Sequence, residues 1–177
     1  MTVEEIKWQV NGSKITHVEA PGAMREMGVE AIFGIHLAGI GILVSKDSYC
    51  EVLDKIHVNA LPNVQPWISG IINLRGNLIP VFDLFFFLEE EAADNKRRLM
   101  VIGQGDKAAA LWIDGFPEIK NSECLKPLNE LPVLPQQLQG FVNGGYTESE
   151  EVWIDLNFDD LFKALGSYQQ ICKEMLT

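Results

Sequence analysis

The chain has few basic residues and no long apolar run, and each shortage excludes a class of function. Its 14 lysines and arginines stand against 25 aspartates and glutamates, which gives a formal net charge of −11. That charge would repel nucleic-acid phosphates and anionic membrane surfaces, so we expect no nucleic-acid partner. No uninterrupted apolar run of about 18 residues occurs, and residues Met1–Trp8 lack a basic start followed by an apolar stretch. We therefore expect a cytoplasmic protein without direct membrane insertion.

Groups that could bind a metal or activate a substrate are also scarce. The cysteines are odd in number and far apart, which favours buried, reduced thiols over a zinc or redox site. The histidines show neither the H-E-x-x-H motif nor an i, i+4 pairing, so we expect them in the core or on the surface. Neither a G-x-S-x-G motif nor a G-x-x-x-x-G-K-[ST] phosphate loop occurs. We expect no catalytic residue, no metal and no organic cofactor. The cysteines and histidines are Cys50, Cys124, Cys172, His17, His36 and His57.

One stretch matches an enzyme motif. Gly103–Ala108 follows an expected strand and fits the G-x-G-x-x-A pattern of dinucleotide binding, with Glu123 near the spacing of a ribose-binding acid. That interpretation needs a crossover helix of about a dozen residues after the motif. Instead, Leu111–Ile113 is followed almost at once by the turn residues Asp114–Pro117. We predict a plain hairpin turn, and we keep a small nucleotide-cofactor-binding enzyme as the alternative function.

From Ala31 onward, short apolar runs separated by turn residues predict an all-β fold with short helices. Hydrophobic residues make up 47% of the chain and charged residues 22%, which is typical of a globular domain. We divide the chain into a leader or peripheral segment (1–28), one domain (29–166) and a C-terminal amphipathic helix (167–177). The expected strands are Ala31–Leu37, Gly41–Val44, Cys50–Ile56, Ile68–Leu74, Leu78–Phe82, Arg98–Ile102, Ala108–Ile113 and Val152–Leu156.

The segment Ile68–Phe82 predicts a β-hairpin, because Gly76 and Asn77 can supply the positive φ angles of a tight turn. Pro80 cannot donate a ladder hydrogen bond, so its strand should lie at an edge or a bulge. A second hairpin is expected from Leu99 to Ile113 about a turn at residues 104–106. In the first hairpin, one face should join Ile68, Ile72 and Leu74 to Leu78, Phe82 and Leu84.

Helices are expected only as short pieces. Asn157 can cap a helix whose Leu161, Phe162 and Leu165 face inward and which Gly166 ends. Ser167 should then open a final helix with a capping box. Its apolar stripe could pack against the domain or dock on a partner, and the sequence leaves both open. The stripe consists of Ile171, Cys172, Met175 and Leu176.

Three local features carry open alternatives. The aromatic run Phe85–Phe87 could be a protein-binding patch, but most of it is expected in the core. The acidic runs Glu89–Glu91 and Glu148–Glu151 are expected to be solvated loops, because no apolar residues surround them to raise a pKa. Arg75 at a hairpin tip has no packing role there; it could form a local salt bridge, lie in solvent or contact a partner.

The stretch Leu61–Leu84 closely resembles the signature of the CheW-like family of coupling proteins. It contains the N-L-R-G turn of that family at Asn73–Gly76 and the following P-V-x-D-L at Pro80–Leu84. Further on, Ala110–Gly115 is similar to the second-lobe strand of the family, and Val152–Leu156 to its closing strand. The chain is more similar to the pilus-associated PilI branch than to flagellar members. The residues that favour that branch are Ile32–Ile35, Leu43–Ser45, Pro66 and Trp67.

This resemblance implies two small SH3-like β-barrel lobes around a shared hydrophobic core, and no enzymatic activity. It implies a scaffold in chemotaxis or twitching-motility signalling that couples methyl-accepting chemoreceptors to a CheA-type histidine kinase, recruited to membrane-associated receptor arrays. A rival is a regulatory lobe that acts on another class of kinase or on the pilus motor. By position, the resemblance assigns receptor binding to Glu51, Val52, Gly70 and Arg75, and kinase binding to Val58, Leu61 and Val64.

Overall fold

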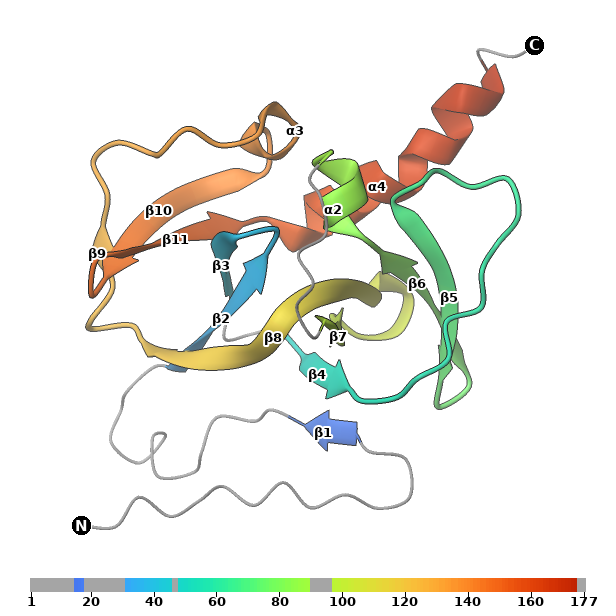
Figure 1. Ribbon diagram of the computed structural model, residues 1–177, viewed down its shortest axis with the longest axis horizontal. Helices are drawn as coiled ribbons and strands as arrows, with labels where there is room; N and C mark the ends of the chain where they lie inside the picture. The colour runs from blue at the N-terminus through green and yellow to red at the C-terminus, as the bar shows by residue number, and fades with distance from the viewer. Residues whose placement is uncertain (1–14, 18–30, 46–47, 90–96, 175–177) are drawn as a thin grey trace.

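The computed structural model describes residues 15–17, 31–45, 48–89 and 97–174, which form a mostly β-strand fold with few short helices (Figure 1). Every expected strand is present. The strands are β1 (Ile15–His17), β2 (Ala31–Leu37), β3 (Ile40–Val44), β4 (Cys50–Leu53), β5 (Ile68–Leu74), β6 (Asn77–Phe82), β7 (Arg97–Ile102), β8 (Ala109–Asn121), β9 (Lys126–Pro127), β10 (Val142–Glu148) and β11 (Glu151–Leu156). The helices are α2 (Leu84–Phe87), the 3₁₀ turn η1 (Gly105–Lys107), α3 (Gln136–Gln139) and α4 (Phe158–Glu174).

Strand β8 joins the two halves of the molecule (Figure 1). The first half contains β1 and β4–β7, and the second half contains β2, β3 and β9–β11. Its first residues pair with β7 and β6, and its last residues, through Asn121, pair with β2. The sequence prediction ended this strand at Ile113, but the strand passes through Gly115, whose φ of 70° allows a local bend. Along the sheet the order is β1-β4-β7-β8-β2-β3-β11-β10-β9, with the β5–β6 hairpin attached to β8. The pairing describes one continuous sheet and does not by itself show two closed barrels.

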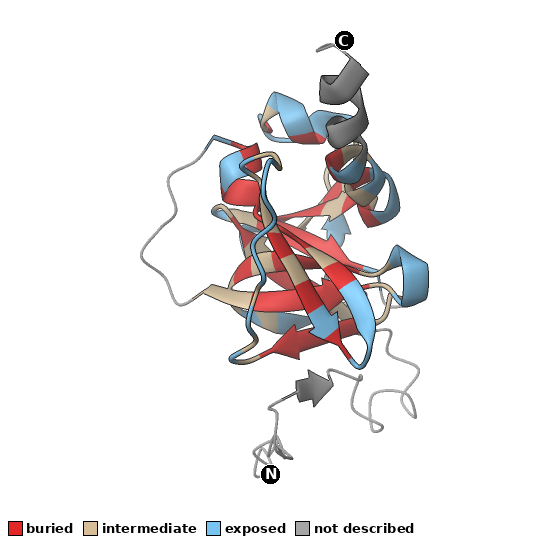
Figure 2. Cartoon of the chain, turned by 90° about the vertical axis from the view of Figure 1, so that its right-hand side faces the viewer, coloured by how far each residue is buried: buried red, intermediate tan, exposed pale blue. Residues whose placement is uncertain are grey.

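Side chains from both halves meet in one large hydrophobic cluster. The buried positions are red in the cartoon of Figure 2. It combines Ile35 and Ile42 of one half with Met100 and Leu111 of the other, and Leu161 of α4 closes it. Each half also has a smaller cluster of its own, one around Ile72 and Val101 and one around Trp153. The expected shared core is therefore present between the halves.

The β5–β6 hairpin forms as predicted, but its turn lies one residue earlier. Positive φ angles occur at Arg75 (53°) and Gly76 (88°), and Leu74 pairs with Asn77. A shift of one residue moves the side chains next to the turn to the opposite face, whereas Phe82 still pairs with Ile68, because β5 has a bulge between Ile68 and Gly70. Leu78 is therefore 68% exposed instead of in the core, and Ile79 is buried in its place.

Pro80 is accommodated because β6 has only one neighbour at that position. Its pairing with β8 begins at Val81, one residue later, and Pro80 itself faces Ile71 of β5. The missing N–H therefore costs no hydrogen bond on the β8 side.

The G-x-G-x-x-A stretch is a hairpin turn. Strands β7 and β8 pair antiparallel from Arg97↔Asp114 to Ile102↔Ala109, and η1 closes the turn between them. Dinucleotide binding of this type needs a parallel strand pair joined by a crossover helix. The interpretation of Gly103–Ala108 as a nucleotide site is therefore wrong.

Helix α4 is longer than predicted. The side chain of Asn157 accepts a hydrogen bond from the backbone N–H of Asp160 at 3.1 Å, which confirms the predicted cap. Gly166 does not end the helix: it lacks the positive φ of a helix-ending glycine, and α4 continues through Ser167 to Glu174. Two separate helices were predicted here, and the structure has one. The side chains of the apolar stripe beyond Gly166 lie outside the described residues.

Helix α2 confirms the expectation for the aromatic run. Asp83 caps it by accepting the backbone N–H of Phe85 at 3.1 Å. Phe85 and Phe87 are buried, whereas Phe86 is 60% exposed. No helix within the described ranges is long and apolar enough to cross a membrane.

Lys120 of β8 is buried among three carboxylates of the second half. Its Nζ lies 2.8 Å from Glu118, 3.1 Å from Glu148 and 3.8 Å from Glu151, and 4.1 Å from the centre of the Trp153 ring. The prediction of a solvated acidic loop is therefore wrong for Glu148, whose side chain is 19% exposed. Glu90 and Glu91 of the other acidic run lie outside the described residues.

Candidate functional site

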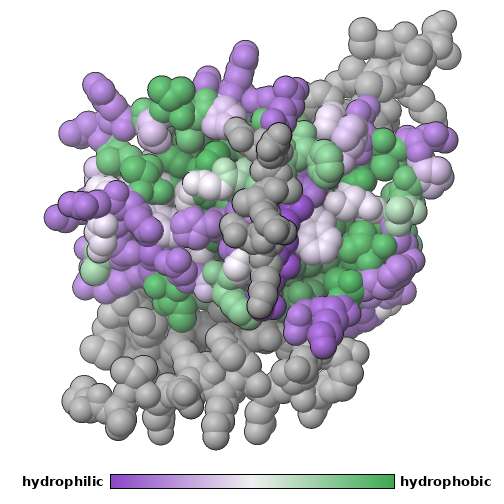
Figure 3. Space-filling model, viewed as in Figure 1, coloured by the Kyte–Doolittle hydropathy of each residue, from purple (hydrophilic) through white to green (hydrophobic). Residues whose placement is uncertain are grey.

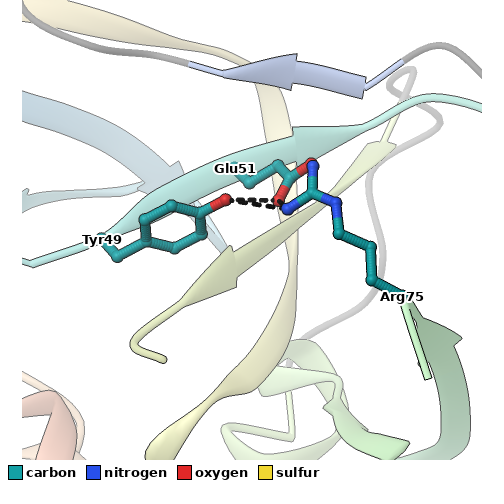
Figure 4. A network of polar contacts seen from close by, with 3 residues as sticks. All are labelled: Tyr49, Glu51 and Arg75. Carbon is teal, nitrogen blue, oxygen red and sulfur yellow. Dashed lines mark hydrogen bonds and ion pairs between the residues drawn. The ribbon is translucent and has the colours of Figure 1, made fainter. Parts of the chain in front are cut away.

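Arg75 at the tip of the β5–β6 hairpin and Glu51 of β4 form a bidentate ion pair (Figure 4). Arg75 Nη2 lies 2.9 Å from Glu51 Oε1, and Nη1 lies 3.3 Å from Oε2. The hydroxyl of Tyr49 donates to Glu51 Oε2 at 2.8 Å and accepts from Arg75 Nη1 at 3.3 Å. These three side chains therefore form one connected network.

The alternation of β4 brings this network together. Cys50 and Val52 face the large core, so Glu51 between them points to the opposite side, toward the β5–β6 hairpin. Tyr49 precedes Glu51 by two residues and so faces the same way. The hairpin turn supplies Arg75 in the left-handed backbone region, a conformation that non-glycine residues seldom adopt outside functional or tightly constrained sites.

Glu51 and Arg75 differ sharply in exposure. The Glu51 side chain is fully buried, whereas the Arg75 side chain is 53% exposed. The hydrogen bond to Tyr49, followed by the charge of Glu51, raises the pKa of Arg75, so the guanidinium stays charged. Burial raises the pKa of Tyr49, which keeps its hydroxyl protonated as a donor. The buried carboxylate is thus neutralised by a cation that still reaches the surface.

Of the three alternatives for Arg75, the local salt bridge is confirmed, and a purely solvated turn is wrong. Arg75 also has a buried partner that depends on it, because the Glu51 carboxylate is fully buried. Half of the guanidinium side chain nevertheless remains at the surface, so partner contact is compatible with the salt bridge.

A pocket of about 340 Å³ surrounds the network. Buried core side chains line it, and so do residues of two turns, at Arg75–Asn77 and Gly103–Gly105. Arg75 is the single cation among the described residues that line this pocket. The lining residues are Tyr49, Glu51, Leu74, Arg75, Asn77, Ile79, Val101, Gly103, Gln104, Gly105 and Ala108.

The remaining predicted receptor residues lie elsewhere. Val52 is 3% exposed within the large core cluster. Gly70 sits at a bulge of β5 with a φ of 140°, and a Cβ there would collide with the backbone carbonyl of Asn59. Asn59 forms a bridge with Ile71 next to it, with backbone hydrogen bonds of 2.8 and 2.9 Å. Gly70 is therefore required by the close approach of these two segments.

The three predicted kinase residues lie on the segment between β4 and β5. Leu61 is 37% exposed, Val64 is partly buried, and Val58 packs against the core cluster of the first half. Leu61 and Gly70 line the same groove of about 370 Å³, which β5, β6, η1 and α4 also border. The structure thus brings Glu51 and Arg75 together at one pocket, and Leu61 and Gly70 together at another. Ala108 lines both.

The sequence analysis missed Tyr49. Tyr49 directly precedes the expected strand Cys50–Ile56 and lies two residues before Glu51. In an extended chain this spacing places both side chains on one face, and it was the signal that could have identified Tyr49. No cluster of three or more potential metal ligands occurs in the part of the chain that the structure describes. Cys50 is buried as expected, whereas Cys124 is exposed, contrary to expectation.

Comparison with known proteins identifies the family. The model of the CheW-like domain matches residues 38–166, well over half of the chain. The chain belongs to the CheW-like family. CheW-like scaffold proteins are non-catalytic, which confirms the prediction that the chain is not an enzyme.

Two relatives share this family. Protein PilI of Pseudomonas aeruginosa is 29% identical over 123 residues, which cover 68% of each protein. Chemotaxis protein CheW of Helicobacter pylori is 27% identical over 88 residues, which cover 45% of this chain and 53% of that protein. The predicted resemblance to the PilI branch is confirmed, and the chain is a CheW-like adaptor related to both proteins.

The fold agrees with a solved CheW structure. The scaffolding protein TtCheW of Thermoanaerobacter tengcongensis superposes with a TM-score of 0.59, over 73% of this chain and 89% of that one. Because the sequence identity is 22%, this match shows the CheW-like fold and nothing beyond it.

Proposed function

We propose that this chain couples the cytoplasmic tip of a methyl-accepting chemoreceptor to a CheA-type histidine kinase, in chemotaxis or pilus-based motility. It acts in the cytoplasm, at membrane-associated receptor arrays, and its two halves correspond to two SH3-like barrels. Membership in the CheW-like family supports this role. The observation that carries it is Arg75, a half-exposed cation that a buried carboxylate holds at the rim of a pocket.

On the receptor side, Arg75 makes the direct polar contact. A planar guanidinium fixed on two oxygens loses little further freedom when it binds a partner. Glu51 contributes by holding Arg75, since its own side chain is fully buried. Val52 and Gly70 contribute through the backbone positions of β4 and β5 rather than through surface contacts.

On the kinase side, the segment between β4 and β5 supplies apolar contacts. Leu61 is its exposed large hydrophobic residue, and Val58 and Val64 support it from partly buried positions. In Figure 3, hydrophobic residues form patches of limited size among hydrophilic ones over the described part of the face shown. Small apolar patches with polar rims are typical of interfaces that assemble and separate.

Affinity capture from a lysate of the source cells tests this function. The parent chain should retain a receptor and a CheA-type kinase. The double variant Arg75→Gln/Glu51→Gln removes the guanidinium without leaving a buried charge, and it should lose the receptor while retaining the kinase. The control Lys126→Gln removes an exposed cation on β9, in the other half, and should retain both. Capture of another kinase class or of a pilus motor component instead would refute the proposed coupling.

A further inference from the structure

We infer that the partner group bound by Arg75 is a neutral hydrogen-bond acceptor, such as a backbone carbonyl or a side-chain amide, and not a carboxylate. This inference rests on the proposed function, because it specifies the chemistry of the same receptor contact. It follows from the N–H donors of Arg75 that its contacts within the chain do not use, from the charge balance of its pocket and from the residues around it.

Arg75 has two N–H donors left after its contacts within the chain. A guanidinium carries five N–H groups. Two on Nη1 bind Tyr49 and Glu51, and one on Nη2 binds Glu51. The Nε–H and the second Nη2–H remain; they lie on the same edge of the planar group and point in parallel. That edge can engage two acceptor lone pairs at once.

The charge of Arg75 is already compensated. Glu51 holds it through both carboxylate oxygens, so the pair is close to neutral as seen from the surface. A partner carboxylate on the remaining edge would lie about 4 Å from the guanidinium and about 7 Å from the Glu51 carboxylate, so repulsion would cancel somewhat more than half of the attraction. The carboxylate would also lose water on entering the pocket. A neutral acceptor meets no such repulsion, loses less free energy on desolvation than a carboxylate does, and still receives a charge-assisted hydrogen bond.

The surroundings of Arg75 that the structure describes supply no second cation. Among the pocket-lining residues that the structure describes, Arg75 is the single basic one. Lys107, on the nearby turn, lies 3.9 Å from Asp159 of α4 and lines the other groove. The exposed residues beside Arg75 include Asn77 and Gln104, whose amides pair well with backbone carbonyls and amides. The formal net charge of −11 disfavours an acidic partner group further.

Tyr49 is a positioning residue in this arrangement. Its hydroxyl uses one Nη1–H of Arg75 and at the same time donates to Glu51. The guanidinium therefore cannot turn about the Cδ–Nε bond without breaking hydrogen bonds to two partners. This fixes which edge of Arg75 faces outward.

Binding of a soluble cytoplasmic receptor fragment at two salt concentrations tests the inference. Calorimetry would give the dissociation constants of the full-length parent and of Arg75→Gln/Glu51→Gln, which has the same net charge. The quantity to compare is the affinity of the parent divided by that of the double variant. A neutral acceptor predicts that this ratio changes less than about fivefold between about 50 and about 500 mM NaCl, because salt screens charge pairs. A larger fall of the ratio at high salt overturns the inference, and so does equal binding by the two proteins.

The single variant Glu51→Gln gives an independent measurement, in case the double variant does not melt cooperatively. It leaves Arg75 as an uncompensated cation. A neutral acceptor predicts equal or weaker binding than the parent, whereas a carboxylate predicts binding at least about fivefold tighter, which would overturn the inference. If the parent binds no receptor fragment at either salt concentration, the proposed function fails instead.

Discussion

The Nη2 of Arg75 lies 2.9 Å from the Oε1 of Glu51, although the two residues are 24 positions apart in the chain. One of them is fully buried and the other is half exposed. The pair therefore links the stability of the first half of the fold to a group that a partner can contact.

Arg75→Ala should lower the free energy of unfolding by about 2 kcal/mol. The loss should be smaller than the 3–5 kcal/mol of a fully buried pair, because water can reach the space that arginine leaves. Arg75→Gln/Glu51→Gln should recover most of the loss, since no buried charge remains. Urea denaturation measures both, and a double variant as unstable as Arg75→Ala would contradict this explanation.

Gly70→Ala should destabilise the protein by about 3 kcal/mol or more. A Cβ at Gly70 would collide with the Asn59 carbonyl, and its φ of 140° is itself unfavourable for alanine. The matched control is Gly39→Ala, also at positive φ (75°) but with open space around it, which should cost about 1 kcal/mol. Thermal melting of the two variants compares them directly. Equal melting temperatures would show that close packing against Asn59 is unimportant.

Lys120→Met should destabilise the second half of the fold. Methionine keeps an apolar stem over Trp153 but leaves Glu118, Glu148 and Glu151 without their common cation. The hydrogen bond from Lys120 lowers the pKa of Glu118, so this contribution is present above the unfolded pKa and is lost as the pH falls through the folded value. The difference in stability between parent and Lys120→Met should therefore shrink from pH about 7 to pH about 3. A difference that is independent of pH would contradict the ion-pair explanation.

Cys124 should react with a thiol reagent much faster than Cys50. Cys124 is exposed, whereas burial raises the pKa of the Cys50 thiol to about 12. In a Cys172→Ser background, rapid labelling should modify one thiol, and Cys124→Ser should remove the rapid phase. Rapid modification of both thiols would show that Cys50 is not sequestered.

The raised pKa of the Cys50 thiol also predicts a pH dependence of the free energy of unfolding. An unfolded Cys50 thiol ionises near its ordinary pKa of 9.0, and the folded one near 12. Its contribution to stability is therefore complete below pH 9 and is lost as the pH rises toward 12. Between pH 9 and pH 12, the stability of the parent relative to Cys50→Ala should fall by about 1 kcal/mol for each pH unit. Equal pH profiles of the two proteins would contradict the shift.

The sequence alone allowed much of the fold to be predicted, because strands and turns depend on local patterns. The hairpin at Asn73–Gly76 was located correctly, and only its register was wrong. Gly76 belongs to both possible turns, Arg75–Gly76 and Gly76–Asn77, so the glycine alone does not decide the register. The side chain of Asn73, which accepts the backbone N–H of Gly76 at 3.0 Å, supports the turn at Arg75–Gly76. The strands β9 and β10 were missed, because one is two residues long and the other contains the Gly144–Gly145 pair.

The site was predictable only in part. The family resemblance selected Glu51 and Arg75 separately, but their ion pair joins β4 to a turn 24 residues later, and no local pattern encodes that contact. The burial of Lys120 was missed for the same reason, since β8 and the β10–β11 hairpin are far apart in sequence. Gly166 was over-interpreted, because its backbone does not turn to positive φ, as that of a glycine at a helix end commonly does.

Co-sedimentation of a CheA-type kinase with receptor-containing membranes tests the adaptor role most directly. The adaptor role predicts that the kinase sediments with the membranes only when this chain is present, and that Arg75→Gln/Glu51→Gln leaves the kinase in the supernatant. It also predicts that Lys126→Gln sediments the kinase like the parent. A kinase that sediments equally well without the chain, or a chain that binds neither the membranes nor the kinase, would contradict this role.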